Sequence, residues 1–267
     1  MTATGPGSTS WRPRAIALDI DGTLLDRDER ISETLKDAVR RAAAAVPVIL
    51  STGRSWHATL PVAEELELPD GIVVCSNGAR TIRYPSGEIL DERTFDAAKV
   101  IQTVRKHAPT ALMAVEEHGI GHRVTGLFPD GDLIGDIRVV EHEDLAREPV
   151  TRLIIRDPES TDADFVELAS RLGLHGVSYF VGWTAWLDIA PEGVDKSTGL
   201  KVALTELGLA AEDLLALGDG RNDIEMLQFA GRGVAMADAP DEVLAAADDI
   251  AKPVHEDGAA LEISRWF

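Results

Sequence analysis

Two carboxylates one residue apart are the first residues of this chain that could do chemistry. Asp19 and Asp21 follow the apolar run 15–18, and Gly22 comes directly after them. The run predicts a buried strand, so both acids lie where the strand emerges into a tight loop. A glycine at this place lets backbone N–H groups approach a bound anion closely. Such a pair either holds a cation or divides the roles of nucleophile and proton carrier, and a solvated turn is the alternative.

Three further polar motifs stand at the ends of predicted strands or at the start of a helix. They are Ser51-Thr52-Gly53-Arg54 after residues 46–50, Lys196 at the start of a predicted helix, and Gly218-Asp219-Gly220-Arg221-Asn222-Asp223 after residues 214–217. A parallel sheet gathers the carboxyl ends of its strands on one edge. Together the motifs offer carboxylates for a hard cation, and a hydroxyl and an ammonium for phosphoryl oxygens.

An alternation of strand and helix patterns must position these motifs. Strands are predicted near residues 15–18, 46–50 and 72–75, with helices over 33–45 and 56–66 between them and Ser32 as the first N-cap. This order is typical of a parallel sheet with right-handed crossovers. It resumes with a helix over 196–207 and a strand over 214–217.

The middle of the chain has a different rhythm. Short strands and frequent glycines follow a hairpin predicted over 81–90, with helices over 95–107 and 162–172. The predicted fold class is therefore α/β, a doubly wound and mainly parallel sheet with an inserted α+β domain. We expect a flexible tail at 1–13, a core formed by 14–82 and 191–267, and the insert at 83–190.

The charge balance limits the partners of the chain. Its 267 residues include 46 acidic and 26 basic ones, which give a formal charge of −20. Such a chain repels nucleic-acid backbones and anionic membranes, so neither is expected as a partner. No apolar run reaches the roughly 18 residues of a membrane helix. Cys75 is the only cysteine, which excludes an intrachain disulfide, and we expect a cytoplasmic monomer or weak homodimer.

The four motifs, in this order, resemble those of the haloacid dehalogenase (HAD) superfamily of phosphotransferases. The resemblance is to the Cof-type sugar phosphatases, which insert a large cap domain between their second and third motifs. It covers nearly the whole chain after Arg14. It extends to Asn77-Gly78-Ala79, Leu187-Asp188-Ile189-Ala190-Pro191, Gly233-Val234-Ala235-Met236 and His255-Glu256-Asp257-Gly258-Ala259.

The resemblance implies a HAD-like core and roles for the acids. Asp19 is then the nucleophile that forms an aspartyl-phosphate, and Asp21 the general acid and base. Mg²⁺ is the implied cofactor, held by Asp19, by Asp219 and by the backbone carbonyl of Asp21. Asp223 acts on the metal directly or through water. Because Mg²⁺ seldom takes more than two carboxylates directly, at least one of these acids is expected to act through water.

The resemblance also implies a set of residues around the phosphoryl group. Thr52 and Lys196 are expected to hold its oxygens and to count as catalytic for that reason. Arg54 and Asn77 face the same edge and either touch the substrate or order their loops. The full predicted substrate-binding set is Gly22, Thr52, Gly53, Arg54, Asn77, Lys196 and Asn222.

The predicted function is Mg²⁺-dependent hydrolysis of a small phosphate monoester, such as a sugar phosphate. A phosphomutase using the same aspartyl-phosphate is the alternative within the enzyme class, and a binding protein that has lost catalysis is the alternative outside it. In the insert, Trp183 and Trp186 suit a sugar face or a packed interface. His118 and His122 suggest a second metal site, but Gly119 and Gly121 between them break the helix that such spacing requires, which favours ordinary surface histidines.

Overall fold

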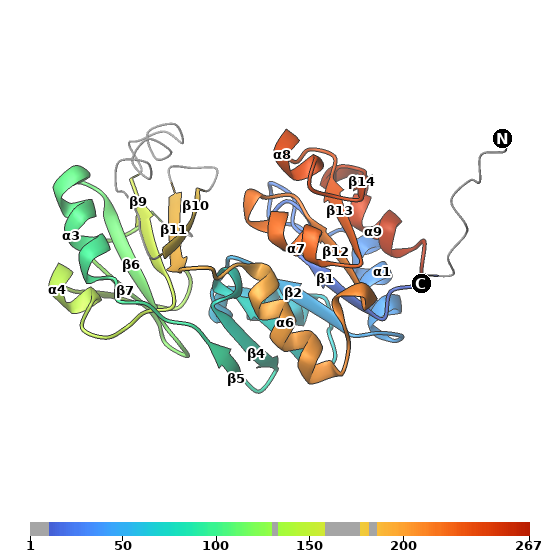
Figure 1. The fold of residues 1–267 in the computed structure, drawn as a ribbon, viewed down its shortest axis with the longest axis horizontal. Helices are drawn as coiled ribbons and strands as arrows, with labels where there is room; N and C mark the ends of the chain where they lie inside the picture. Colours follow the sequence, from blue (N-terminus) through green and yellow to red (C-terminus); the bar gives the residue numbers. More distant parts are fainter. Residues whose placement is uncertain (1–10, 130–132, 158–176, 182–185) are drawn as a thin grey trace, which may run out of the picture.

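The computed structural model of the protein describes residues 11–129, 133–157, 177–181 and 186–267. These residues form two β-sheets, each flanked by helices, in two lobes that lie side by side (Figure 1). We call the eight-stranded sheet the core sheet and the six-stranded one the cap sheet. The helix predicted over 162–172 and Trp183 lie outside the described residues.

The core sheet has the strand order β14-β13-β12-β1-β2-β3-β4-β5. The first six strands in this order run parallel, and β4 and β5 add an antiparallel hairpin at one edge. The strands are β1 Ala15–Leu18, β2 Val48–Ser51, β3 Gly71–Cys75, β4 Arg80–Tyr84, β5 Glu88–Glu92, β12 Leu214–Gly218, β13 Arg232–Met236 and β14 Asp249–Ala251. β1 lies between β2 and β12, so its carboxyl end is surrounded by other strand ends.

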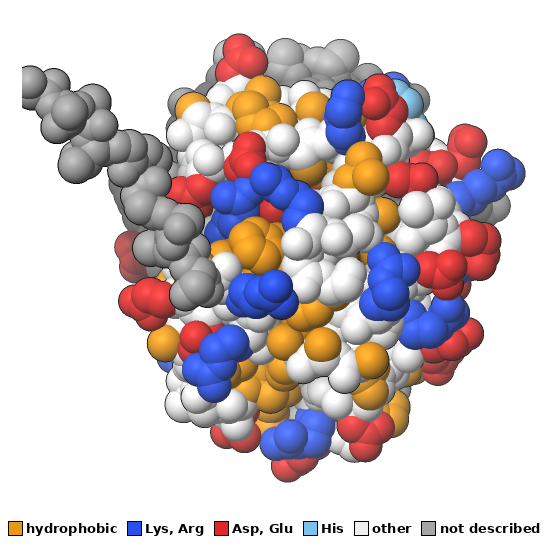
Figure 2. All heavy atoms as spheres, turned by 90° about the vertical axis from the view of Figure 1, so that its right-hand side faces the viewer, with side chains coloured by type: hydrophobic (Ala, Val, Ile, Leu, Met, Phe, Trp, Pro, Cys, Tyr) orange, Lys and Arg blue, Asp and Glu red, His pale blue; other side chains and the backbone are white. Residues whose placement is uncertain are grey.

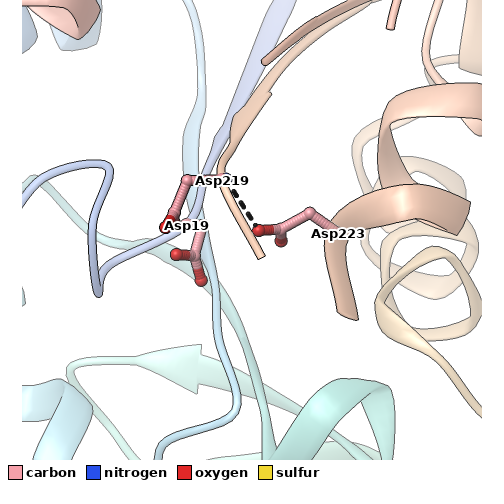
Figure 3. A group of neighbouring side chains, drawn as sticks. All are labelled: Asp19, Asp219 and Asp223. Atoms are coloured by element: carbon pink, nitrogen blue, oxygen red, sulfur yellow. Dashed lines mark hydrogen bonds between the residues drawn. The ribbon is translucent and has the colours of Figure 1, made fainter. Parts of the chain in front are cut away.

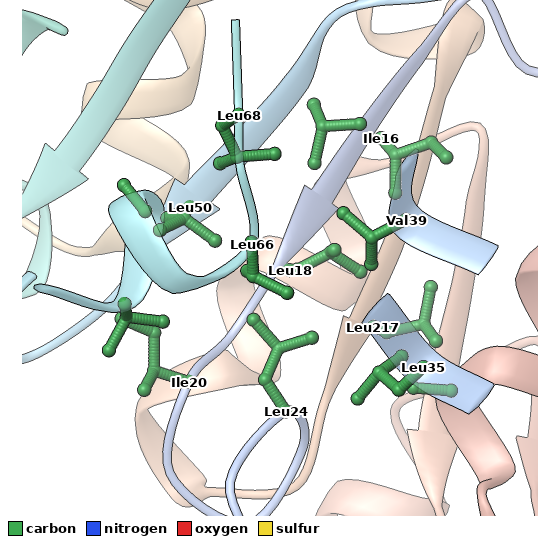
Figure 4. Close-up of a cluster of buried hydrophobic side chains, with 14 of the residues drawn as sticks. Ile16, Leu18, Ile20, Leu24, Leu35, Val39, Leu50, Leu66, Leu68 and Leu217 are labelled. Atoms are coloured by element: carbon green, nitrogen blue, oxygen red, sulfur yellow. The ribbon is translucent and has the colours of Figure 1, made fainter. Parts of the chain in front are cut away.

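Helices cover both faces of the core sheet because both faces of its strands are apolar. Ile16 and Leu18 point to the face that carries α1, α2 and α9, where Leu35 and Val39 pack against them (Figure 4). Ala15 and the other alternate residues point to the face of α6, α7 and α8. The helices are α1 Glu33–Ala43, α2 Trp56–Glu65, α6 Lys196–Leu207, α7 Ile224–Phe229, α8 Asp241–Leu244 and α9 Gly258–Ile263. The predicted doubly wound α/β core is confirmed.

The helix ends follow from local chemistry that the sequence displays. The Ser32 hydroxyl accepts a hydrogen bond from the Leu35 N–H, as expected of the N-cap of α1. α6 covers the predicted residues, with Asp195 as its N-cap, bonded to the Thr198 N–H. Its first residue is Lys196, so capping of this helix also fixes where the lysine side chain leaves the backbone.

The cap sheet has the order β10-β11-β9-β6-β7-β8 and is antiparallel except between β7 and β8. Its elements are β6 Leu112–Glu117, β7 Gly121–Val124, β8 Asp136–Val139, β9 Leu153–Arg156, β10 Val177–Val181, β11 Trp186–Pro191, α3 Ala98–His107 and α4 His142–Leu145. α3 and α4 pack on one face through Val104 and Leu145. The other face carries Glu116 and Asp188, which bond to residues of the core.

The junctions between the lobes lie after β5 and after β11. The predicted hairpin is confirmed as β4 and β5, and both strands belong to the core sheet. The boundaries expected at 82/83 and 190/191 remain a prediction. Trp11, within the predicted tail, packs edge to face on Trp266 with ring centroids 5.2 Å apart. No helix among the described residues is long and apolar enough to span a membrane.

One end of the core lobe shows how the charged residues are distributed. Lys and Arg side chains on this face lie among Asp and Glu side chains (Figure 2). Ion pairs of this kind include those of Arg232 and Arg265, which both pair with Asp249 and Glu262. The bases of such a face are engaged locally with acids, which agrees with the acidic balance of the chain.

The packing of α1 and α9 on one face of the core sheet predicts that a Leu→Ala substitution lowers the free energy of unfolding by different amounts at a buried and at an exposed position. Leu35 on α1 is 4% exposed, whereas Leu261 on α9 is 53% exposed. We expect Leu35→Ala to lower the free energy of unfolding by about 2–5 kcal/mol, because it leaves a cavity against β1. Leu261→Ala should change it by less than about 0.5 kcal/mol. Urea unfolding of both variants checks this, and equal losses would contradict the packing described.

Candidate active site

The ends of β1 and β12 bring two acids side by side. Leu18 pairs with Leu217 across the parallel strands, and Asp19 and Asp219 follow these residues by one and two positions. The Asp19 N–H donates to the Leu217 carbonyl at 3.0 Å, which continues the ladder past the end of β1. Both carboxylates are buried, at 4% and 8% exposure. The sheet register therefore forces them together.

A third acid joins them from the 3₁₀ turn Arg221–Asp223 that precedes α7. Asp223 Oδ2 accepts hydrogen bonds from the N–H groups of Asp219, at 3.0 Å, and Gly220, at 2.9 Å. Carboxylate oxygens of Asp19, Asp219 and Asp223, one from each, lie within 4.8 Å of one another. Figure 3 shows the three side chains converging from the two strand ends and this turn.

Lys196 provides the positive charge in this cluster. Its Nζ donates to Asp19 Oδ1 at 2.5 Å and to Asp223 Oδ1 at 2.6 Å, and its side chain is fully buried. Burial disfavours the ammonium, but the charges of Asp19 and Asp223 outweigh it and raise the pKa of Lys196 above its ordinary value. The lysine is therefore a fixed cation at neutral pH.

One ammonium cannot neutralise three buried carboxylates. Burial, with the nearby charge of Asp223, raises the pKa of Asp19 well above its ordinary value. The same two causes raise the pKa of Asp219 to about 7. A divalent cation would relieve this repulsion, and carboxylate oxygens are the donors that hard cations such as Mg²⁺ prefer. The donor set thus fits a divalent metal ion.

The loop after β1 is shaped to admit Asp219. Gly22 has φ +86°, and a Cβ at this position would lie 2.2 Å from Asp219 Oδ2. Only glycine fits such a backbone beside such a neighbour. The buried Thr23 hydroxyl donates to Asp219 Oδ1 at 3.3 Å. Thr23 therefore helps to orient the Asp219 carboxylate.

The Ser51–Arg54 motif lies on the other side of Asp19. The buried Thr52 hydroxyl accepts a hydrogen bond from the Arg54 N–H at 3.0 Å, so its own proton can be donated elsewhere. The Arg54 guanidinium binds the Asp21 carboxylate through Nε, at 3.0 Å, and Nη2, at 2.5 Å. The Asp21 side chain is 58% exposed and its carboxylate is not part of the three-acid group.

Asn77 and Asn222 are joined to each other. Asn222 Nδ2 donates to Asn77 Oδ1 at 2.9 Å, while Asn77 Nδ2 donates to Asp188 Oδ2 at 3.3 Å. A Cβ on Gly53 would lie 3.1 Å from Asn77 Oδ1, so this glycine allows the close approach. The structure therefore brings all the predicted site residues to one edge of the core sheet. Their individual roles remain predictions.

Residues of the cap sheet also reach this edge, and the sequence did not single them out for that. Arg152 donates to both oxygens of Asp188, at 2.9 and 2.8 Å, and the Trp186 Nε1–H donates to Oδ1 at 2.8 Å. Glu116 accepts from the Ser76 hydroxyl at 2.6 Å. The available signal was a single charged residue, Asp188, within the otherwise apolar strand Trp186–Pro191.

The expectation for His122 was wrong. It is 2% exposed rather than on the surface, because its side chain shares the inner face of the cap sheet with its cross-strand neighbour Glu116. Burial lowers the pKa of His122 to about 4, so the ring is neutral at pH 7. The described residues contain one group of acids, histidines or cysteines that could hold a metal, the Asp19 group.

Comparison with known proteins agrees with this geometry. The model of the haloacid dehalogenase-like hydrolases matches residues 16–263. The chain is 29% identical to a 5-amino-6-(5-phospho-D-ribitylamino)uracil phosphatase of Bacillus subtilis, covering 95% of each chain. It is 29% identical to a phosphoglycolate phosphatase of Methanothermobacter thermautotrophicus, covering 95% of this chain and 99% of that protein.

A solved structure shows the same fold. The chain matches a sugar phosphatase of HAD subclass IIB with a TM-score of 0.81 and 24% identity, covering 94% of this chain and 98% of the other. The likeness extends over both sheets. It thereby supports the arrangement of a HAD-like core with an inserted cap.

The charge imbalance predicts how stability depends on pH when no divalent ion is bound. Asp219 binds its proton more tightly in the folded protein than in the unfolded chain, so the free energy of unfolding falls as pH rises from about 4 to 7. Each such proton contributes up to about 1.4 kcal/mol per pH unit to the free energy of unfolding.

Thermal melting in a chelator should show this loss of stability, and saturating Mg²⁺ at pH 8 should restore it. Asp219→Asn is the matched control and should reduce both responses, with the raised pKa of Asp19 accounting for the pH dependence that stays. A chelated protein that gains stability from pH 5 to 8 would contradict the electrostatics.

Proposed function

This chain belongs to the haloacid dehalogenase-like hydrolases as a phosphatase of the Cof type, and from that premise we propose that it hydrolyses a small phosphate monoester through an aspartyl-phosphate on Asp19, with Mg²⁺ as cofactor. The observation that carries the proposal is the buried cluster in which Lys196 binds Asp19 and Asp223 beside Asp219. Three acids and one fixed cation leave excess negative charge at the carboxyl edge of the sheet. An anionic substrate can bind there only if further positive charge, such as a metal ion, is present.

Mg²⁺ would be held by Asp19, Asp219 and the backbone carbonyl of Asp21. When bound, it supplies positive charge that brings a carboxylate nucleophile and a phosphoryl group together. Asp223 fits a supporting role better than direct ligation. Its two oxygens already accept hydrogen bonds from Lys196, from the Asp219 N–H and from the Gly220 N–H.

In the first step an Asp19 oxygen attacks phosphorus. The new bond joins this oxygen to phosphorus, and the bond from phosphorus to the leaving alcohol oxygen breaks. Lys196 and the Thr52 hydroxyl donate hydrogen bonds to the phosphoryl oxygens. The backbone at Gly22 and Gly53 lets the phosphoryl group approach closely. Asp21 gives a proton to the leaving oxygen.

In the second step Asp21 takes a proton from water, whose oxygen attacks phosphorus. The bond to Asp19 breaks, so inorganic phosphate leaves and the enzyme returns to its first state. Asp21 suits both transfers because it is two residues from Asp19 yet exposed to solvent. Arg54 binds Asp21 and is proposed to touch the substrate, so the acid step requires one Asp21 oxygen to leave the guanidinium.

The relatives support an inference about the substrate class. The two phosphatases reported above are named for 5-amino-6-(5-phospho-D-ribitylamino)uracil and for phosphoglycolate, both small phosphorylated metabolites. Both are aligned with this chain over nearly their whole length, cap included. We therefore place the substrate among small phosphorylated metabolites, with sugar phosphates as the first class to test.

Removal of the nucleophile should abolish turnover without unfolding the protein. We expect Asp19→Asn to lower Mg²⁺-dependent phosphate release at least about 1,000-fold, because the amide cannot form the acyl phosphate. Asp28→Asn makes the same change at an exposed position after the loop and should keep wild-type rates. Full activity of Asp19→Asn would overturn the assignment.

The products separate the phosphatase from a phosphomutase. A screen of sugar phosphates, phosphoglycolate, pyridoxal phosphate and nucleotides with Mg²⁺ should release phosphate from at least one ester, and chelation should stop the release. Chromatography of the sugar products should show no positional isomer, because water rather than a second hydroxyl takes the phosphoryl group. Isomer formation without phosphate release would favour the mutase.

A further inference from the structure

The short 3₁₀ turn Ser76–Gly78, which follows β3, has an unusual backbone. Ser76, Asn77 and Gly78 have φ values of 51°, 53° and 91°. Two consecutive non-glycine residues in the left-handed region are costly, and such conformations persist only where the surroundings fix them. The turn is fully buried between the two sheets, so its conformation is set by its neighbours.

The backbone of this turn binds the other loops of the catalytic edge. The Ser76 N–H donates to the Arg54 carbonyl at 2.9 Å, and the Asn77 N–H donates to the Thr52 carbonyl at 3.0 Å. A Cβ on Gly78 would lie 1.9 Å from the Asp195 carbonyl, directly before Lys196. The turn therefore touches the loop after β2 and the start of α6.

The Asn77 side chain adds a link in each direction. Toward the core, its Oδ1 accepts from Asn222, which stands next to Asp223 in the turn that positions the acids. Toward the cap, its Nδ2 donates to Asp188 on β11. Asn77 is 1% exposed. Its carbonyl and its amide group are both occupied by protein, which suits a residue that acts through its neighbours.

Asp188 is firmly held within the cap. It accepts two hydrogen bonds from Arg152, which directly precedes β9, and one from Trp186, and both members of the Arg152–Asp188 pair are buried. A buried bidentate pair is rigid and orients its remaining acceptor sites. Asp188 is therefore fixed to the cap sheet, and its distance from Asn77 depends on where the cap lies relative to the core.

We propose that Asn77 is a positioning residue that couples the placement of the cap to the turn carrying Asp219 and Asp223, through the hydrogen bonds Asp188–Asn77–Asn222. With the cap in the position described, the link holds the 219–223 turn in the geometry that binds the metal and Lys196. When the cap moves away, Asn77 loses one partner and that turn loosens. For its effect on activity, the inference rests on the proposed phosphatase reaction.

The first test is hydrogen exchange of the metal-free protein, which needs no activity. Asn77→Gly removes both side-chain links while tolerating the left-handed backbone. The double variant Arg152→Met/Asp188→Leu removes the acceptor on the cap without leaving an unpaired buried charge. We expect both to speed amide exchange in residues 218–224 at least about threefold. The double variant lies wholly in the cap, so its effect on this turn is the direct sign of coupling.

Ser76→Ala is the matched control. It removes a buried bond from the same turn to the cap, the one to Glu116, but no link to the 219–223 turn. We expect exchange in residues 218–224 to stay at the wild-type rate. If all three variants speed exchange equally, general loosening explains the result and the proposal is overturned. If Asn77→Gly or the folded double variant leaves exchange unchanged, it is likewise overturned.

The second test follows the metal requirement of phosphate release. Loss of a residue that orients metal ligands typically costs 10–100-fold in metal affinity or activity. Asn77→Gly and the double variant should both raise the Mg²⁺ concentration for half-maximal release by about tenfold, and combining them should add nothing further. A change in the KM for the phosphate ester, with no change in the Mg²⁺ requirement, would contradict coupling to the acids. If the wild-type protein releases no phosphate, the proposed function fails, while the exchange experiment still decides the coupling.

Discussion

The structure of the site depends on one ammonium group among three buried carboxylates. Lys196 lies 2.5 Å from an oxygen of Asp19 and 2.6 Å from an oxygen of Asp223, with none of its side chain exposed. Each buried ion costs several kcal/mol in lost hydration, which only close and well-oriented partners return. The fold therefore has to hold the lysine and the acids rigidly. It does so by capping α6 directly before the lysine and by placing two of the acids directly after the paired parallel strands β1 and β12.

The same requirement explains how the cap is joined to the core. β11 ends at Pro191 and α6 begins at Lys196, so the segment that returns from the cap sheet delivers the lysine to the site. The turn after β3 packs against the backbone just before that lysine and also bonds to two cap strands. The cap is thus joined to the core next to the start of α6, where Lys196 lies.

Much of this arrangement could be predicted from the sequence, because local patterns carried it. The apolar run before Asp19 and the helix pattern that begins at Lys196 are such signals, and the parallel order of the strands then brings their ends together. β8 could not be predicted, because all four of its residues are exposed and show no alternation of buried and exposed positions. The pairing of Arg152 with Asp188 and the left-handed backbone of Ser76 could not be predicted either. They depend on which strands of the two sheets meet, and no local pattern records that.

Asp19 and Asp21 show how position alone gives two identical side chains different surroundings. They are two residues apart, yet Asp19 is 4% exposed and bound by a lysine, while the Asp21 side chain is 58% exposed and bound by an arginine. A carboxylate fixed between a buried cation and two other acids cannot turn toward solvent, so it is suited to attack a group brought to it. A carboxylate at the rim can exchange protons with water and with a leaving oxygen. Gly22, which directly follows Asp21, has φ +86° and leaves no room for a Cβ beside Asp219, so the chain can turn there between the buried acids and the exposed Asp21.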